Sequence, residues 1–239
     1  MGGEALPKVL MPICGKPLIA HTLQHIECVR RAQLPPIIVV GYKAKIVMKQ
    51  LGPQYRYVIQ KEQRGTGHAV LQARETVKGQ FDHIVVLYGD HPYIPAETID
   101  ELIATHLRQQ TVLTMMTVTV EDFADWRISL YDYGRVLRDE QGTIVRIVEP
   151  RDATEAQLEI REVVPSYFCF EADWLWTHLE QLQTDNTQGE YYLTDMPGLA
   201  IREGQKIVSL ACDALFALGV NNREELHNLE RLLCGQANK

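Results

Sequence analysis

The sequence predicts an α/β fold with a mostly parallel sheet, because short apolar runs alternate with stretches of helical periodicity. Its 239 residues, 46% of them hydrophobic, suit one large domain or two small ones. A chain of this size buries a sizeable core without needing a disulfide or a metal for stability. Continuous apolar runs also favour strands that helices cover on both faces.

In the first half of the chain, predicted strands and helices alternate. Apolar runs predict strands at 36–41, 57–60 and 84–88, the last of which leads into Gly89 and Asp90. Helical spacing of apolar residues predicts helices at 18–31, 67–77 and 96–109. This alternation implies right-handed crossovers between neighbouring strands.

After about residue 111 the pattern changes to short strands separated by turns. These strands are predicted at 112–120, 127–130, 135–137, 144–149 and 163–170. Helices are predicted at 171–183, 191–203 and 222–234, and Asn222 followed by Glu225 is typical of a helix start. We expect a single domain, 1–239, in which the part from about 111 onward forms the second wall of a cleft.

Composition excludes several classes of protein. Asp and Glu number 31 against 24 Lys and Arg, and the net charge of −7 argues against a surface that coats nucleic acid. An anionic ligand must then be held by local amides, a few cations or a metal. No apolar run is long enough to span a membrane, and no signal pattern opens the chain. Five cysteines without a C-x-x-C pair favour reduced thiols in a cytoplasmic protein.

Four positions carry residues suited to phosphate chemistry, and each also has a plain structural reading. Lys8 follows a proline and can meet a phosphate, or is a surface lysine. The glycine-rich turn 60–69 precedes a helix and can bring free amides to a ligand, or is an ordinary loop. Asp90 follows a strand, where it can bind Mg²⁺ or cap a helix. Asn221 offers an oxygen ligand or belongs to a helix cap, while His68 and His91 show no pattern of their own.

Seven segments occur in an order that resembles the uridyltransferase domain of the bifunctional N-acetylglucosamine-1-phosphate uridyltransferase family. They are 7–10, 60–68, 88–90, 133–135, 147–149, 189–195 and 219–223. The resemblance spans nearly the whole chain, and Gly-Glu-Tyr-Tyr at 189–192 and Gly-Val-Asn-Asn-Arg at 219–223 are its most specific parts. It implies a Rossmann-like nucleotidyltransferase fold, with a nucleotide-binding half at about 1–110 and a sugar-phosphate half at about 111–239.

The resemblance also implies an activity and a role for each matching residue. UTP and N-acetylglucosamine-1-phosphate would give UDP-N-acetylglucosamine and pyrophosphate, with Mg²⁺ as cofactor. Lys8 would be the catalytic lysine, and Asp90 with Asn221 would bind the metal. The nucleotide would contact Gln60, Gly65 and Thr66. The sugar phosphate would contact Tyr88, Gly89, Gly134, Glu149, Tyr192 and Thr194.

The sequence departs from the family pattern in three places. It begins at Met1 where the family's glycine-rich loop would end, so we expect a shortened form with little or no activity. Val164-Pro165-Ser166 replaces the usual Asn-Thr-Gly, and no β-helix region follows at the C-terminal end. Two alternatives stay open: an enzyme for another sugar phosphate or base, and a non-catalytic domain that binds nucleotide sugars. The oligomeric state is open as well.

Overall fold

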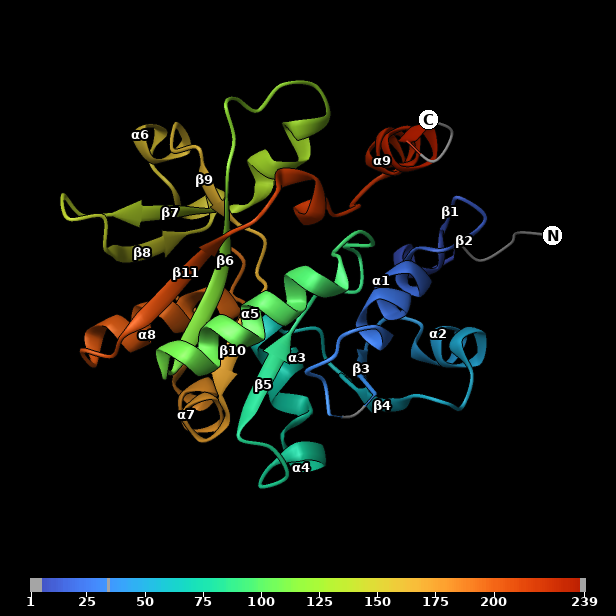
Figure 1. Cartoon of the computed structure of the whole chain (residues 1–239), viewed down its shortest axis with the longest axis horizontal. Helices are drawn as coiled ribbons and strands as arrows, with labels where there is room; N and C mark the ends of the chain where they lie inside the picture. Colours follow the sequence, from blue (N-terminus) through green and yellow to red (C-terminus); the bar gives the residue numbers. More distant parts are fainter. Residues whose placement is uncertain (1–5, 34, 237–239) are drawn as a thin grey trace.

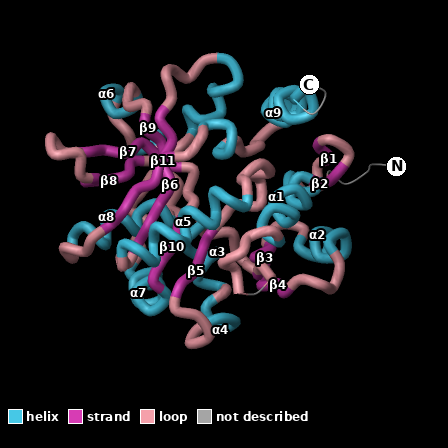
Figure 2. Tube along the Cα trace, viewed as in Figure 1, coloured by secondary structure: helices cyan, strands magenta, loops and turns pink. Residues whose placement is uncertain are grey.

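A computed structural model of the chain describes residues 6–33 and 35–236 (Figure 1). It confirms the predicted α/β class, because a central mixed sheet is packed between helices (Figure 2). The helices are α1 (Leu18–Glu27), α2 (Ala44–Leu51), α3 (Thr66–Gln72), α4 (Arg74–Val77), α5 (Ala96–Gln109), α6 (Glu155–Leu158), α7 (Ala172–His178), α8 (Met196–Arg202) and α9 (Arg223–Gln236). Short 3₁₀ helices lie at 8–10, 125–132, 150–152, 179–181, 193–195 and 214–217.

The central sheet has seven strands and mixed directions. Its order is β5 (His83–Val86), β10 (Phe168–Glu171), β6 (Leu113–Thr119), β9 (Glu162–Val164), β7 (Gly134–Arg138) and β8 (Ile144–Val148), with β11 (Ile207–Ala211) also on β6. Strand β10 is antiparallel to both β5 and β6, so β5, β6 and β11 share one direction. The pairs made by β7, β8 and β9 are all antiparallel. The parallel character predicted from the sequence thus belongs to β5, β6 and β11, with one reversed strand between them.

Both faces of this sheet are buried, which explains its continuous apolar runs. On one face, Met116 of β6 and Cys169 of β10 belong to the same core cluster as Leu102 of α5. On the other, Met115 and Phe168 pack in the cluster that contains α7 and α8. Successive strand residues point to opposite faces, so neither face of β6 or β10 tolerates a polar stripe.

The predicted strand 163–170 forms two strands with a bulge between them. Both β9 and β10 pair with β6, but residues 164–167 face only 116–117. Pro165 has no amide to donate, and Ser166 adopts a left-handed backbone with φ of 60°. The extra residues therefore leave the ladder and turn their side chains in new directions.

A smaller sheet lies beside the main one. Strands β3 (Ile37–Val40) and β4 (Arg56–Ile59) pair in parallel and, among the described residues, pair with no other strand. A short hairpin of β1 (Pro12–Ile13) and β2 (Lys16–Pro17) precedes α1. The turn of this hairpin meets the last helix, because the Cys14 amide donates to Glu230 of α9 over 3.0 Å. The early and late parts of the chain are thus side by side (Figure 1).

Other local predictions are corrected by the structure. The strand predicted at 127–130 is wrong, because Asp125–Asp132 is a 3₁₀ helix. The Asp122 carboxylate accepts from the Ala124 amide and from Arg127, which favours a tight turn here over an extended chain. The helix predicted at 67–77 is divided at Ala73 into α3 and α4. Neither α2 nor β11 is predicted from the sequence.

The structure also tests the predictions about the cysteines and about membrane-spanning segments. Cys28, Cys169 and Cys212 are free thiols, whereas Cys14 is disulfide-bonded, so the prediction of reduced thiols is wrong for Cys14. The side chain of Cys234 is not among those described. In the described part of the chain, no helix combines the length and apolarity needed to cross a bilayer.

Helix α5 offers a test of the packing on one face of the sheet. Leu102 is fully buried, whereas Leu107 on the same helix is 43% exposed. Leu102→Ala leaves a cavity and should reduce the free energy of unfolding by about 2–5 kcal/mol. Leu107→Ala should change it by less than about 1 kcal/mol. Urea unfolding measures both, and equal losses for the two variants would contradict this packing.

Candidate active site

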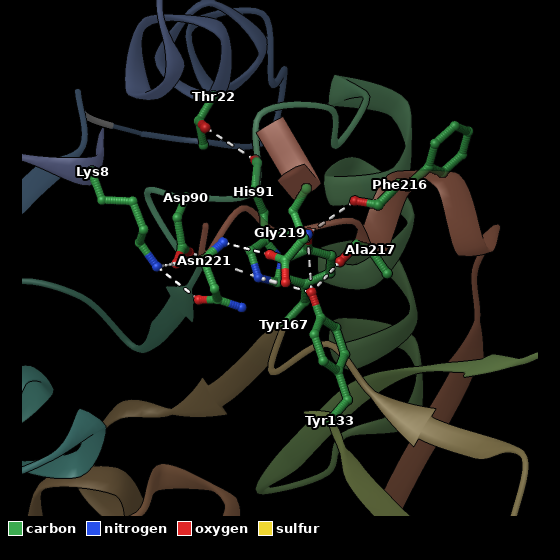
Figure 3. Close-up of polar contacts among 11 residues, drawn as sticks. Lys8, Thr22, Asp90, His91, Tyr133, Tyr167, Phe216, Ala217, Gly219 and Asn221 are labelled. Atoms are coloured by element: carbon green, nitrogen blue, oxygen red, sulfur yellow. Dashed lines mark hydrogen bonds and ion pairs between the residues drawn. The ribbon is translucent and has the colours of Figure 1, made fainter. Parts of the chain in front are cut away.

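Three polar side chains from distant parts of the chain meet at one point (Figure 3). The Lys8 ammonium donates to Asp90 Oδ2 over 2.5 Å and to Asn221 Oδ1 over 2.9 Å. Asp90 follows β5 at the edge of the sheet, Lys8 begins the first 3₁₀ helix, and Asn221 lies just before α9. Burial raises the pKa of Asp90, but the neighbouring His91 and Lys8 outweigh this and lower it overall. Asp90 is therefore an anion beside a cation at neutral pH.

The same two oxygens fit a divalent metal. Asp90 supplies a carboxylate and Asn221 a neutral amide oxygen, and both point to the position of the Lys8 nitrogen. Mg²⁺ prefers oxygen ligands and usually binds one or two carboxylates together with waters and phosphates. Among the described residues no cluster of three or more His, Cys, Asp or Glu side chains forms a metal site. A metal held by this pair would need further ligands beyond these two oxygens.

Each residue of the 219–222 motif has a distinct structural task. A side chain at Gly219 would approach His91 Nε2 to 2.6 Å, so only glycine fits there. The Val220 amide donates to the Asp90 carbonyl over 3.1 Å. Asn222 accepts from the Glu225 amide over 2.9 Å, which confirms the predicted helix start. Asn221 is thereby placed between a buried anchor and a capped helix.

His91 was not predicted to matter, yet its ring is buried at the centre of this region. Its Nδ1 lies 2.8 Å from the Tyr167 hydroxyl, and its ring stacks on Tyr133 with centroids 5.7 Å apart. Burial lowers the pKa of His91 and raises those of Tyr133 and Tyr167, so all three favour the neutral form. The sequence offered no signal at His91, because the tyrosines that pack around its ring are distant from it in the sequence.

The predicted nucleotide residues cluster in the glycine-rich turn. Gly65 has φ of 104°, and a Cβ there would lie 2.6 Å from the Tyr191 carbonyl, so both backbone shape and space require glycine. The Thr66 hydroxyl accepts from the Leu193 amide over 2.9 Å. Gln60 is buried, and its side-chain amide donates to the Gly65 carbonyl over 3.1 Å. The turn is therefore fastened to the 191–193 segment, so two of the motifs that carry the resemblance are neighbours.

The predicted sugar-phosphate residues are brought together only in part. Thr194 donates its hydroxyl to Glu149 Oε1 over 2.5 Å, and a Cβ at Gly134 would lie 3.4 Å from the same oxygen. Tyr88 lies between the glycine-rich turn and the bulge, because the side chains of Thr66 and Ser166 are both close enough to its hydroxyl to lower the Tyr88 pKa against the larger effect of burial, which raises it. The Tyr192 hydroxyl instead donates to Gln188.

Gly89, the remaining residue predicted to contact the sugar phosphate, lies against helix α1. A Cβ there would meet Ile19 of α1 at 3.3 Å, so Gly89 lets that helix approach the end of β5. Among the side chains named by the resemblance for the sugar phosphate, Glu149 and Thr194 contact each other directly. The binding roles of all these residues stay predictions.

The comparisons with known proteins agree with this geometry. The profile of the MobA-like NTP transferase domain matches residues 1–195. The chain belongs to this family. Proteins named Bifunctional protein GlmU are similar to it: that of Brevibacillus brevis is 38% identical over 226 residues, and that of Enterococcus faecalis is 35% identical over 235 residues. These alignments cover 94% and 98% of the chain but 47% and 49% of the relatives, so the chain spans about half their length.

Solved structures show the same fold at low sequence identity. A UDP-glucose pyrophosphorylase bound to UDP-glucose has a TM-score of 0.72 and 14% identity, covering 97% of this chain and 92% of that one. A CMP:2-keto-3-deoxy-manno-octonic acid synthetase bound to CTP has a TM-score of 0.67 and 14% identity, covering 98% and 95%. The predicted resemblance and the Rossmann-like nucleotidyltransferase fold are both confirmed.

Glu149 gives a pH-dependent prediction. Burial raises its pKa, and the nearby Asp195 and Asp152 raise it further. A carboxyl with a raised folded-state pKa costs stability when ionised, and this cost fades as the pH falls from the folded pKa towards the unfolded one. Glu149→Gln should therefore be more stable than the wild type at pH 7, with the difference vanishing near about pH 4.

Glu162 is the matched control for this measurement. Burial raises its pKa, but the hydrogen bond from Arg138 outweighs this and lowers it. Its carboxylate stabilises the fold above the unfolded pKa, so Glu162→Gln should be less stable than the wild type at pH 7. Thermal unfolding across pH measures both variants, and a Glu149→Gln variant that loses stability at pH 7 would contradict the assignment.

Proposed function

We propose that the chain is a sugar-1-phosphate nucleotidyltransferase that uses UTP and N-acetylglucosamine-1-phosphate. The convergence of Lys8, Asp90 and Asn221 is the observation that carries this proposal. It brings a cation and two oxygen ligands together at the end of β5, with Lys8 and Asp90 from the half assigned to the nucleotide and Asn221 from the other half. The family and the relatives named GlmU support the reaction class.

The transfer of the nucleotidyl group requires neutralisation of negative charge more than it requires a protein base. A sugar phosphate is already largely ionised at neutral pH, because its second pKa is about 6. One of its oxygens forms a bond to the α-phosphorus of UTP as the bond to the β-phosphate oxygen breaks. Pyrophosphate leaves with the electron pair. The protein must neutralise the gathered negative charge and hold the two phosphates in line.

The site residues divide this work. Lys8 contributes a positive charge to the phosphate oxygens, and Gln60, Gly65 and Thr66 hold the uridine side. Asp90 and Asn221 would hold Mg²⁺, which when bound adds positive charge against the phosphates. Glu149 accepts a hydrogen bond from a hydroxyl of the sugar, as it does from the Thr194 hydroxyl in this structure. The other sugar-side contacts fall to Tyr88, Gly89, Gly134, Tyr192 and Thr194.

An enzyme for another sugar phosphate is the second candidate. Val164 is buried, and its Cγ1 lies 3.2 Å from the Cβ position of Gly134, which also adjoins Glu149. An apolar side chain stands where the family has an amide. A missing hydrogen-bond donor weakens binding of a sugar that needs it, so this position favours a changed preference.

Asp90→Ala tests the catalytic proposal. Losing the carboxylate should reduce turnover at least about 100-fold, because the ligand that would hold Mg²⁺ beside the reacting phosphates is removed. The assay follows pyrophosphate release with UTP, Mg²⁺ and N-acetylglucosamine-1-phosphate at high protein concentration, so that slow rates are measurable. Asp173→Ala, an exposed change on α7, is the control and should retain the wild-type rate. Unchanged turnover of Asp90→Ala at saturating Mg²⁺ would refute the assignment.

The Val164 position is tested with a panel of sugar-1-phosphates. The wild type should discriminate less well for N-acetylglucosamine-1-phosphate than Val164→Asn, which restores an amide at the bulge. The ratio of kcat/KM values between this sugar and glucose-1-phosphate should rise about 2- to 10-fold in the variant, the effect of one hydrogen bond. A strict preference in the wild type that the variant does not change would show that Val164 has no part in sugar choice.

A further inference from the structure

The Tyr133 hydroxyl holds the backbone that leads to Asn221. It donates to the Ala217 carbonyl over 2.6 Å and accepts from the Gly219 amide over 3.0 Å (Figure 3). These two groups lie on either side of Leu218, so one hydroxyl satisfies a donor and an acceptor of the same loop. Tyr133 comes from the turn before β7, directly after the 3₁₀ helix Asp125–Asp132, and packs against the same core cluster as Leu229 of α9.

Tyr167 and His91 extend this contact into a network. Tyr167 is fully buried at the bulge between β9 and β10, and it donates to the Phe216 carbonyl over 2.9 Å. A hydroxyl has one hydrogen, so the 2.8 Å contact with His91 requires that Nδ1 of the imidazole donates to Tyr167. The His91 ring then stands between the two tyrosines, 3.3 Å from the Tyr133 hydroxyl through Nε2.

The network joins both candidate metal ligands. His91 directly follows Asp90, and its carbonyl accepts from Thr22 of α1 over 3.0 Å. The loop 216–219 lies against the His91 ring so closely that Gly219 has no room for a side chain. Two residues later, Asn221 meets Lys8. A displacement of the loop therefore moves Asn221 relative to Asp90.

The geometry points to Tyr133 as a positioning residue that, with His91 and Tyr167, sets the Asn221 side chain against Asp90 and Lys8. This inference rests on the proposed function where it treats Asn221 as a metal ligand. Tyr133 acts through the loop, because in the described structure its hydroxyl donates to the Ala217 carbonyl and accepts from the Gly219 amide, with the His91 ring beside it. Groups of this kind, one step removed from a metal, usually change metal affinity about 10- to 100-fold when they are mutated.

The variant Tyr133→Phe tests this role with the aromatic ring kept in place. Tyr57→Phe is the matched control, because the Tyr57 hydroxyl donates to the Gly52 carbonyl over 2.6 Å at the end of α2. Tyr133→Phe loses the two bonds of its hydroxyl to backbone groups, and Tyr57→Phe loses one such bond. In the pyrophosphate assay, Tyr133→Phe should raise the Mg²⁺ concentration for half-maximal rate about tenfold or more, with the KM for the sugar phosphate within about twofold. Tyr57→Phe should change neither value.

A second measurement does not depend on activity. In protein labelled with ¹⁵N-asparagine, the backbone and side-chain amide signals of Asn221, assigned through Asn221→Ser, should shift or broaden in Tyr133→Phe and stay in place in Tyr57→Phe. Unmoved Asn221 signals, or an unchanged Mg²⁺ dependence, would overturn the positioning role. A wild type without any turnover would instead count against the proposed function, and the Asn221 signals would still decide the role of Tyr133.

Discussion

The candidate site depends on the contact between two loops, the one after β5 and the one before α9. A single backbone bond, from Val220 to the carbonyl of Asp90, joins them directly, and buried aromatic groups fill the space behind it. Backbone polar groups buried in this way need partners, and here the partners are phenol hydroxyls. The side chains of Asp90 and Asn221 can both contact Lys8 only because these two loops are held together in the protein interior.

The bulge between β9 and β10 shows how the sheet serves this contact. A regular strand would place successive side chains on alternate faces of the sheet. The extra residues at Pro165 and Ser166 break this alternation, so Tyr167 contacts His91 while Ser166 lies close to the Tyr88 hydroxyl. The irregular segment at 164–167 thus contacts the loop that carries Asp90 and also lies close to Tyr88, which is beside the glycine-rich turn.

Rules of local sequence predicted much of the fold and the ends of several elements. Apolar periodicity gave α5 with its observed bounds, and the strand-end position of Asp90 and the cap at Asn222 follow from general rules. Long-range contacts were out of reach. The burial of His91 depends on Tyr133 and Tyr167, which are separated from it by 42 and 76 residues. The bulge depends on the pairing register of β9 and β10 with β6, which no local pattern specifies. The site residues named by resemblance were found as motifs, but their mutual contacts needed the structure.

The Lys8 contacts have a consequence for the order of folding. Lys8 is separated by 82 residues from Asp90 and by 213 from Asn221, so the trio spans nearly all of the described chain. Closing such long loops carries an entropic cost and tends to occur late. A chain emerging from the ribosome cannot assemble these groups until the segment before α9 has been synthesised. A partly made chain therefore lacks the contacts of Lys8 with Asp90 and Asn221.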